Sequence, residues 1–399
     1  MTVDREEYSV PGFSAAAVAT GVKGAGKRDL SLIVAQAPAV AAGVFTTNLF
    51  PAAPVVIDRE RIASGRAQAI LVNSGCANAA TGDEGEHDAL RISRTLAGHM
   101  NIEDNLILLA STGVIGHRLP VASIEQAMPS LLSALRVDGI AEAQEGIMTT
   151  DRFPKIASRR CMIDESSVVL CGIAKGAGMI EPHMATMLAF VFTDAAVEAA
   201  CLDRLLREAV GQSFNAVSVD GCMSTNDTAI MLAGGAAGNR LLKESSPSIN
   251  HFREALASLM ESLAVAIVRD GEGATKVVTI RVEKAASVEE ARHIAYFVAN
   301  SNLVKTAFYG GDPNWGRIIS AVGAGGVALD PGRVELFIGG HLLFSKGQGR
   351  TERQDEIIEI MKRPEIDVTI ALGRGRSAFR LYTSDLTHDY VTLNAHYHT

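Results

Sequence analysis

The sequence predicts a layered α/β fold with mixed sheets. Short apolar runs recur along the 399 residues, and amphipathic patterns of helical period separate many of them. The alternation is irregular, and short turns join several pairs of apolar runs. Parallel neighbours need a crossover between strands, so mixed sheets covered by helices fit this pattern better than a regularly wound parallel sheet.

The elements follow in order along the chain. Eight apolar runs have the length of strands: residues 30–34, 69–72, 106–109, 168–173, 187–192, 277–282, 334–338 and 368–372. Five longer stretches place apolar residues on one helical face: residues 84–99, 195–213, 250–268, 287–299 and 353–361. A chain of this length predicts two domains. We expect a main domain of residues 1–280 and a smaller domain of residues 281–399, divided where a strand gives way to a helix.

Composition excludes several classes of protein. The chain is 47% hydrophobic and 21% charged, with a net charge of −8 and no basic run, so neither nucleic acid nor a membrane surface is an expected partner. The first residues are acidic and no apolar stretch exceeds strand length, which predicts neither a signal peptide nor a membrane span. Five cysteines without Cys-x-x-Cys spacing indicate buried thiols in a cytoplasmic protein, and the ten histidines lack metal spacing.

The most informative segment is residues 175–194. A glycine run and a proline deliver Thr186 to the start of an apolar strand, directly after the small residue Ala185. The Thr186 hydroxyl could attack the Ala185 carbonyl, cut the chain and free an α-amine. That amine, with a reference pKa of about 7.7–8.0, could then serve as the base for its own hydroxyl. Local sequence leaves open a glycine loop before a buried strand, in which Thr186 only fills a strand position.

Other segments carry weaker signals. Thr112 and Gly113 follow the strand at 106–109, where a hydroxyl and an N–H could point two donors at one oxyanion, although this segment by itself favours a plain turn. The small and amide residues at 73–82 and 218–228 could form Asx-rich turns. Residues 21–28 nearly match a phosphate-binding loop, but they lack its hydroxyl and precede a strand, so a lysine-rich turn is expected.

Taken in order, these segments resemble the ornithine acetyltransferase family, also called glutamate N-acetyltransferases, of arginine biosynthesis. The resemblance runs from residues 43–48 to residues 394–399, and its longest motifs are residues 175–188 and 305–317. It implies an α/β/β/α sandwich with two sheets between helices, and a smaller carboxy-terminal α/β domain whose tail returns to the active site. Cys76, Leu49, Asn302, His183 and the pair at 222–223 depart from residues common in the family, but none removes a proposed catalytic group.

The resemblance also implies roles for individual residues. The chain would cut itself between Ala185 and Thr186, leaving Thr186 as the nucleophile, with Thr112 and Gly113 as the oxyanion-hole pair. A lysine suits a substrate carboxylate and a glutamate suits a cation, whereas such charges standing alone are usually solvated. The positions that match the family's amino-acid-binding residues are Thr149, Lys175, Thr186, Glu272, Asn394 and Thr399.

The implied function is transfer of an acetyl group from N-acetylornithine to glutamate through an acetyl-Thr186 intermediate, with neither metal nor organic cofactor. The implied assembly is a heterotetramer of two cleaved two-chain units. Three alternatives stay open at this point. An amino-terminal-nucleophile hydrolase or aminopeptidase would pass the acyl group to water, a bifunctional member would also accept acetyl-CoA as donor, and a non-catalytic scaffold protein would not be cleaved.

Overall fold

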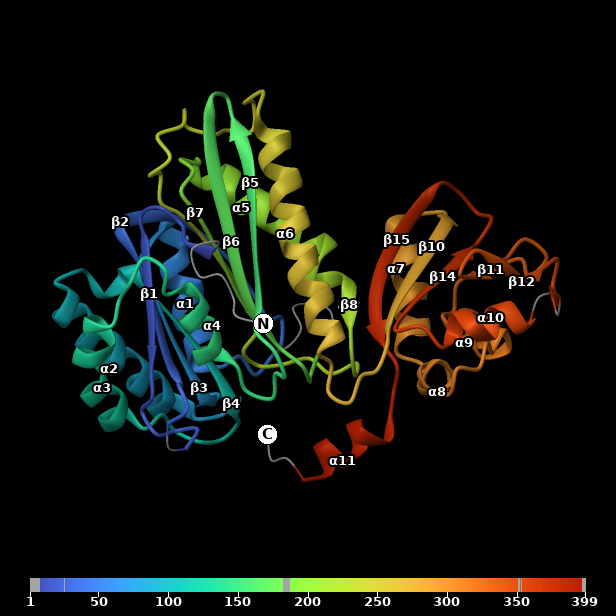
Figure 1. Ribbon diagram of the computed structural model, residues 1–399, viewed down its shortest axis with the longest axis horizontal. Coiled ribbons are helices and arrows are strands. Elements are labelled where there is room, and N and C mark those ends of the chain that lie inside the picture. The colour runs from blue at the N-terminus through green and yellow to red at the C-terminus, as the bar shows by residue number, and fades with distance from the viewer. Residues whose placement is uncertain (1–7, 25, 182–186, 351, 353, 397–399) are drawn as a thin grey trace.

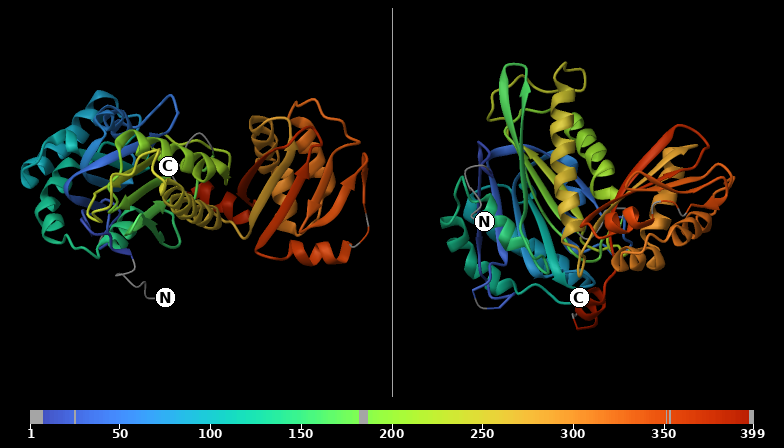
Figure 2. Two further views of the ribbon diagram at one scale, coloured as in Figure 1. Left: turned by 90° about the horizontal axis from the view of Figure 1, so that it is seen from above. Right: turned by 45° about the vertical axis from the view of Figure 1, so that its right-hand side comes forward.

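The computed structural model describes residues 8–24, 26–181, 187–350, 352 and 354–396 of the chain. Within these residues, two mixed β-sheets with their covering helices make up the protein (Figure 1, Figure 2). One sheet belongs to the amino-terminal and central part of the chain. The other is built almost wholly from the carboxy-terminal part.

The first sheet has eight strands in the order β4-β3-β2-β9-β7-β6-β5, and β1 pairs with β2. The long strand β2 joins two halves of this sheet. Its residues 30–35 pair with β1, and residues 40–45 pair with β9 on the other half. The strand bounds are β1 Phe13–Val18, β2 Leu30–Phe45, β3 Arg66–Cys76, β4 Ile107–Val114, β5 Lys155–Ile163, β6 Ser166–Lys175, β7 Leu188–Thr193 and β9 Thr228–Ala233.

The two halves of the sheet pack face to face. Alternate residues of a strand point to opposite faces, and in β3 Ile70 belongs to the core between the halves whereas Leu71 belongs to the core under the outer helices. Phe13 of β1 meets Phe192 of β7 across this inner core, with ring centroids 5.6 Å apart. Because strands such as β6 and β7 are buried on both faces, their sequences are continuous apolar runs.

Helices cover both outer faces. Helices α2 and α3 pack on the half that contains β3 and β4, and α5 and α6 pack on the half that contains β6, β7 and β9. The predicted α/β/β/α sandwich is therefore confirmed, with the difference that β2 makes its two layers one hydrogen-bonded sheet. The helix bounds are α1 Ala53–Arg61, α2 Gly82–Met100, α3 Val121–Ser133, α4 Ile140–Ile147, α5 Ala199–Gln212 and α6 Ile249–Arg269.

The second sheet has seven strands in the order β13-β12-β11-β14-β10-β15-β8. Its short edge strand β8 (Val217–Ser218) comes from the first part of the chain and pairs with β15. The remaining strands are β10 Val277–Ala285, β11 Glu335–Ile338, β12 His341–Ser345, β13 Gln348–Gly349, β14 Glu365–Ala371 and β15 Ser377–Ser384. The helices of this part are α7 Val288–Ala299, α8 Asn302–Gly310, α9 Trp315–Ala324, α10 Gln354–Met361 and α11 His388–His396.

We propose that residues 1–280 and 281–399 form the two domains. The proposal is supported by a hydrophobic core whose buried members all lie between residues 278 and 381, apart from the cores of the first sheet. The proposed boundary falls within β10, and β8 ties the two parts together. The last helix, α11, leaves β15 and lies beside the lower end of the main part rather than on the second sheet (Figure 1).

Each predicted strand and helix overlaps an observed one, while further elements went unpredicted. Residues 21–24 and 26–28 lead into β2 rather than into a helix, which agrees with the expected lysine-rich turn. The expectation of buried thiols is correct for Cys76, Cys171 and Cys201 but wrong for Cys222, which is exposed. Among the described residues, no helix is both long and apolar enough to span a membrane.

Candidate active site

A pocket of about 170 Å³ opens where the ends of β4 and β6 meet the carboxy-terminal helix. We call it the Thr112 pocket. Its walls come from segments far apart in the chain, which only the fold brings together. The lining residues are Thr112, Gly113, Thr149, Thr150, Lys175, Gly178, Met179, Asp220, Cys222, Glu272, Tyr390 and Asn394.

Thr112 and Gly113 lie at the end of β4, beside the parallel strand β3. Gly113 pairs with Gly75 in that ladder and adopts φ of +134°, a conformation that side chains rarely tolerate. A Cβ at Gly113 would come within 2.3 Å of the Gly75 carbonyl carbon, so the close approach of the two strands requires glycine here. The Thr112 hydroxyl and the Gly113 backbone consequently occupy a rigid strand end that borders the pocket.

Lys175 is the last residue of β6 and is 4% exposed. Its ammonium donates a hydrogen bond of 3.0 Å to the Thr112 hydroxyl oxygen. Burial lowers the pKa of Lys175, and the negative charge of Asp151 acts in the opposite direction. The lysine nitrogen is therefore held in a buried place beside the candidate oxyanion donor, where charges interact more strongly than in water.

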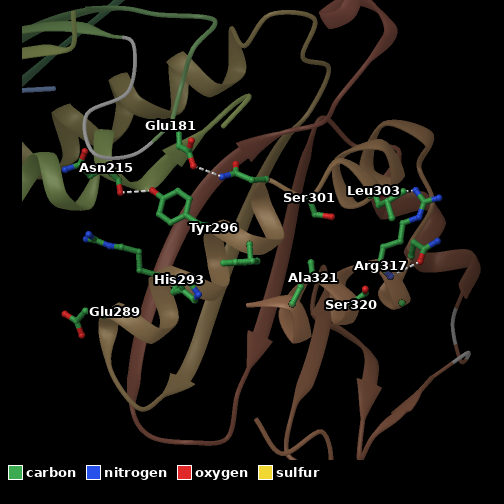
Figure 3. A pocket seen from close by; sticks show the side chains of 16 residues that line it. Glu181, Asn215, Glu289, His293, Tyr296, Ser301, Leu303, Arg317, Ser320 and Ala321 are labelled. Atoms are coloured by element: carbon green, nitrogen blue, oxygen red, sulfur yellow. Dashed lines mark hydrogen bonds between the residues drawn. The ribbon is translucent and has the colours of Figure 1, made fainter. Parts of the chain in front are cut away.

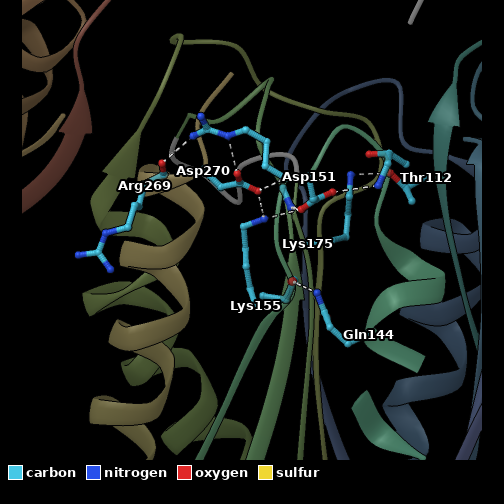
Figure 4. Close-up of polar contacts among 11 residues, drawn as sticks. Thr112, Gln144, Asp151, Lys155, Lys175, Arg269 and Asp270 are labelled. Carbon is cyan, nitrogen blue, oxygen red and sulfur yellow. Dashed lines mark hydrogen bonds and ion pairs between the residues drawn. The ribbon is translucent and has the colours of Figure 1, made fainter. Parts of the chain in front are cut away.

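A buried chain of alternating charges supports Lys175 from behind (Figure 4). The Asp151 carboxylate accepts hydrogen bonds from the Gly176 N–H at 2.8 Å and from the Lys155 ammonium at 2.6 Å. Lys155 also donates to Asp270 at 2.6 Å, and all three side chains of this part are fully buried. Burial opposes ionisation of Asp151, but Lys175 and Lys155 outweigh it and lower its pKa to about 2.

The opposite wall carries carboxylates and the carboxy-terminal helix. Glu272 accepts a hydrogen bond of 2.9 Å from the Asn394 side-chain amide of α11. Asp220 accepts hydrogen bonds from the backbone N–H groups of Met179 and Ile180 at 2.7 and 2.8 Å, while burial raises its pKa. The pocket lining thus combines a lysine and hydrogen-bond donors with carboxylates, and the charge of Glu272 acts on Lys175.

A relay of contacts connects Met187 to the same pocket. The Met187 N–H donates to the Asp227 carboxylate at 3.1 Å, and the neighbouring Asn226 amide donates to the Ser111 carbonyl at 2.8 Å. Burial raises the pKa of Asp227 well above its usual range. These bonds hold the residue that follows Thr186 close to the strand end that carries Thr112.

Six predicted site residues line this one pocket: Thr112, Gly113, Thr149, Lys175, Glu272 and Asn394. Ala185, Thr186 and Thr399 lie outside the described residues. The site assignment left out Asp151, Lys155, Asp220, Asp270 and Tyr390. Asp220 stands inside the segment 218–228 that the sequence singled out, whereas nothing local in the sequence pairs Lys155 with Asp270, 115 positions away.

Across the described part of the chain, no group of three or more His, Cys, Asp or Glu side chains is arranged to hold a metal ion. The polar groups of the Thr112 pocket instead suit an acyl-transfer site, with donors for an oxyanion at one end and hydrogen-bonding groups for an amino acid around it.

Comparisons with known proteins agree with this arrangement. The ArgJ family model matches residues 14–399. The arginine biosynthesis bifunctional protein ArgJ of Syntrophotalea carbinolica is 46% identical over 391 residues, covering 98% of this chain and 99% of that protein. The protein of the same name from Geobacter sulfurreducens is 46% identical over 398 residues, covering 98% and 100%.

A solved structure shares the fold over part of the chain. The crystal structure of arginine biosynthesis bifunctional protein argJ from Bacillus halodurans is 36% identical with a TM-score of 0.51, and it aligns over 52% of this chain and 98% of its own. The family resemblance seen in the sequence is thereby confirmed, and the chain belongs to the ArgJ family.

Proposed function

We propose that this protein is a self-processing acetyltransferase that moves an acetyl group from N-acetylornithine to glutamate through an acetyl-Thr186 intermediate. The observation that carries the proposal is the Thr112 pocket, where β4, β6, the turn after α6 and helix α11 each contribute a predicted site residue. The relatives' names, which assign them to arginine biosynthesis as bifunctional proteins, point to the same chemistry.

The shape of the substrate fits the two ends of the pocket. In N-acetylornithine the acetylated nitrogen and the carboxylate are bonded to the same carbon, so groups that hold the acetyl oxygen and the carboxylate must be neighbours. Thr112 and Lys175 are such neighbours. The substrate's ammonium is three methylenes further on, and Glu272 with Asn394 offers it an acidic partner at the opposite wall.

Self-cleavage would precede turnover. The Thr186 hydroxyl attacks the Ala185 carbonyl, the acyl group shifts from nitrogen to oxygen, and water hydrolyses the ester to free the Thr186 amine. Two observations support this step. Met187 is anchored by Asp227 close to the oxyanion donors, and the solved Bacillus halodurans chain corresponds to only 52% of this chain, the length expected of one cleavage product.

In turnover the freed α-amine accepts the proton of the Thr186 hydroxyl as its oxygen attacks the acetyl carbonyl. Thr112 and Gly113 donate hydrogen bonds to the oxyanion, each such donor being worth about 2.7–4 kcal/mol in the transition state. The C–N bond then breaks, and the α-ammonium returns the proton to the leaving ornithine amine. Glutamate's amine attacks the acetyl ester in the mirrored second step and regenerates Thr186.

The test measures the masses and the amino-terminal residues of the chains in the purified protein. We expect two chains of about 20 and 22 kDa, the second beginning at Thr186, and a single uncleaved chain without transfer activity for Thr186→Ala. Thr186→Ser is the matched control, because it keeps the hydroxyl and should still be cut. Cleavage or full activity in Thr186→Ala would contradict the proposal.

A second donor is favoured by the word bifunctional in the relatives' names. We propose that acetyl-CoA also acetylates Thr186, so that glutamate can be acetylated without N-acetylornithine. Incubation of the cleaved protein with acetyl-CoA should release about one equivalent of CoA per site, and continued release should require glutamate. Release of acetate without any amine would instead identify the hydrolase alternative.

We also propose that the protein is cytoplasmic and assembles as a heterotetramer of two cleaved units. A native mass of about 84 kDa, twice the 42.1 kDa of the chain, would agree with that assembly. A native mass equal to a single cleaved unit would contradict it.

A further inference from the structure

A second cavity, much larger than the Thr112 pocket, lies among the helices of the second sheet (Figure 3). It measures about 970 Å³ and is lined by α7, the start of α8, the length of α9, and Glu181 and Asn215 from the main part. We call it the α7–α9 cavity. None of its lining residues lines the Thr112 pocket. Its volume is in the range of sites that take nucleotide-sized ligands.

Arg292 of α7 gives this cavity a cation. Its guanidinium lies over the Phe379 ring, 5.0 Å from the ring centroid. Its Nε is buried without a hydrogen-bond partner among the described residues, and the pKa of the exposed Glu289 is lowered by hydrogen bonds from its own backbone and Ser287 and, to a smaller extent, by the charge of Arg292. A buried donor without an acceptor is costly, and the planar fork of an arginine suits the oxygens of a phosphate.

The opposite side of the cavity adds further attraction for an anion. Helices α8 and α9 both begin there, capped by Ser301 and Asn314, and helix starts carry partial positive charge. Arg317, in the first turn of α9, also lines the cavity and donates to the Leu303 carbonyl at 2.9 Å. Two arginines and two helix starts therefore face the same space from different elements.

The acidic groups around the cavity offset this attraction only in part. Glu289 is exposed, at the first turn of α7. The Glu181 carboxylate accepts a hydrogen bond of 2.9 Å from Asn300, and burial raises the pKa of Glu181. Tyr296, Phe297 and Ala321 supply an aromatic and apolar wall, on which a flat ring could lie.

Only one segment separates this cavity from the Thr112 pocket. Asp220 and Cys222 line the Thr112 pocket. Gly221, between them, lies against Asn300 of the α7–α9 cavity, since a Cβ at Gly221 would come within 3.6 Å of the Asn300 Cγ. The segment of residues 220–222 thus borders both spaces, so a ligand seated in the cavity lies next to a wall of the Thr112 pocket.

We propose that the α7–α9 cavity binds the phosphate-bearing nucleotide of acetyl-CoA, with Arg292 as its main anchor. This proposal rests on the proposed use of acetyl-CoA as second donor. In that step the Thr186 oxygen bonds to the acetyl carbon, the carbon–sulfur bond breaks, and the leaving thiolate takes the proton held by the Thr186 α-amine. The nucleotide remains in the cavity, and the flexible arm of CoA carries the acetyl thioester to the Thr112 pocket.

The test uses the cleaved full protein and measures CoA binding by calorimetry and KM for acetyl-CoA. Arg292→Gln removes the anchor, and Ala324→Trp fills the cavity from the exposed end of α9. Loss of one charge-assisted contact should weaken CoA binding and raise KM by at least about tenfold. Transfer from N-acetylornithine to glutamate should change less than about twofold in both variants, and Arg240→Gln, an exposed arginine outside the cavity, should change nothing.

The outcomes separate this proposal from the function on which it rests. If the wild type uses acetyl-CoA and both variants keep its KM, the nucleotide lies elsewhere and the cavity proposal is wrong. If the wild type neither binds CoA nor uses acetyl-CoA, the cavity proposal and the second donor fail together, while transfer from N-acetylornithine still decides the main function. Inorganic phosphate that competes with CoA in the wild type but not in Arg292→Gln would support the anchor.

Discussion

The Lys175 ammonium donates its hydrogen bond to the oxygen of the Thr112 hydroxyl, across 3.0 Å and between strands β6 and β4. A hydroxyl that accepts from a cation keeps its own hydrogen free to donate elsewhere, and the positive charge strengthens that donation. Lys175 could therefore do two things: bind a substrate carboxylate, and polarise the Thr112 hydroxyl, which is the candidate oxyanion donor. The two roles are compatible because the acetyl oxygen and the carboxylate of the substrate are close neighbours.

Thr112→Val should therefore remove the donor while keeping the shape of the side chain. We expect kcat to fall by about 10²–10³ and KM to change little, since the oxyanion exists only in the transition state. Thr112→Ser restores the hydroxyl and should recover most of the rate. Steady-state kinetics on cleaved protein measure both, and a loss of less than threefold in Thr112→Val would remove Thr112 from the oxyanion hole.

Asp151→Asn should be strongly destabilising. Asp151 neutralises Lys155 together with Asp270 and lowers the charge cost of burying Lys175. Breaking a buried charge pair typically costs about 3–5 kcal/mol of unfolding free energy. Urea denaturation measures this, with Asp203→Asn as control, because Asp203 pairs with Arg207 on the exposed face of α5 and should cost under about 1 kcal/mol. Equal losses in the two variants would contradict the expected importance of the buried network.

The same carboxylate predicts a pH dependence. The folded-state pKa of Asp151 is about 2, below its unfolded value, so its stabilisation is complete above the unfolded pKa and is lost as the pH falls toward 2. The shift of nearly two units corresponds to about 2.5 kcal/mol. The stability difference between wild type and Asp151→Asn should accordingly shrink between pH 6 and pH 2. A difference that stays constant over this range would show that Asp151 titrates normally.

The apolar pattern predicted the strands whose side chains are buried on both faces, such as β6 and β7, because their sequences are continuous apolar runs. It missed β1, which is rich in alanine, and β5, which is largely half-exposed and polar. Both are strands because of their neighbours, β2 and β6, rather than because of their own composition. Local pattern cannot report pairing partners of this kind.

In the candidate site, too, some residues could be predicted from the sequence and others depend on neighbours that only the fold supplies. The family resemblance named Thr112, Lys175, Glu272 and Asn394 before any geometry was available, and the fold brings all four to one pocket. The charges behind Lys175 could not be foreseen, since Lys155 and Asp270 come from a strand and from the end of a distant helix. Residues 302–310 and 315–324 were not among the predicted helices, yet they form α8 and α9, because Ser301 and Asn314 cap two short helices there.

Glu272→Gln should separate the two amino-acid substrates. N-Acetylornithine presents an ammonium to this wall, whereas glutamate ends in a carboxylate that gains nothing from a negative partner. We expect KM for N-acetylornithine to rise by about tenfold or more, the loss of one charge-assisted hydrogen bond, and KM for glutamate to stay level or fall. The glutamine oxygen can still accept from Asn394, so α11 should remain in place. An equal rise for both substrates would mean that Glu272 positions the helix rather than the ligand.

Gly273→Ala should detach the carboxy-terminal helix from the pocket. Gly273 has φ of +69°, and a Cβ there would lie 2.4 Å from the Tyr390 backbone nitrogen and 2.8 Å from the Thr387 hydroxyl, which itself donates to the Gly273 carbonyl. Helix α11 contains no buried residue, so its displacement should cost little stability while withdrawing Asn394 from Glu272. We expect KM for N-acetylornithine to rise and the melting temperature to change by only a few degrees, as for a chain that lacks residues 394–399. Gly326→Ala is the matched control, because Gly326 has φ of +68° but open space around its Cβ position. If KM for N-acetylornithine rises equally in both alanine variants, strain in the backbone rather than displacement of α11 explains the rise. In that case the position of α11 does not contribute to substrate binding.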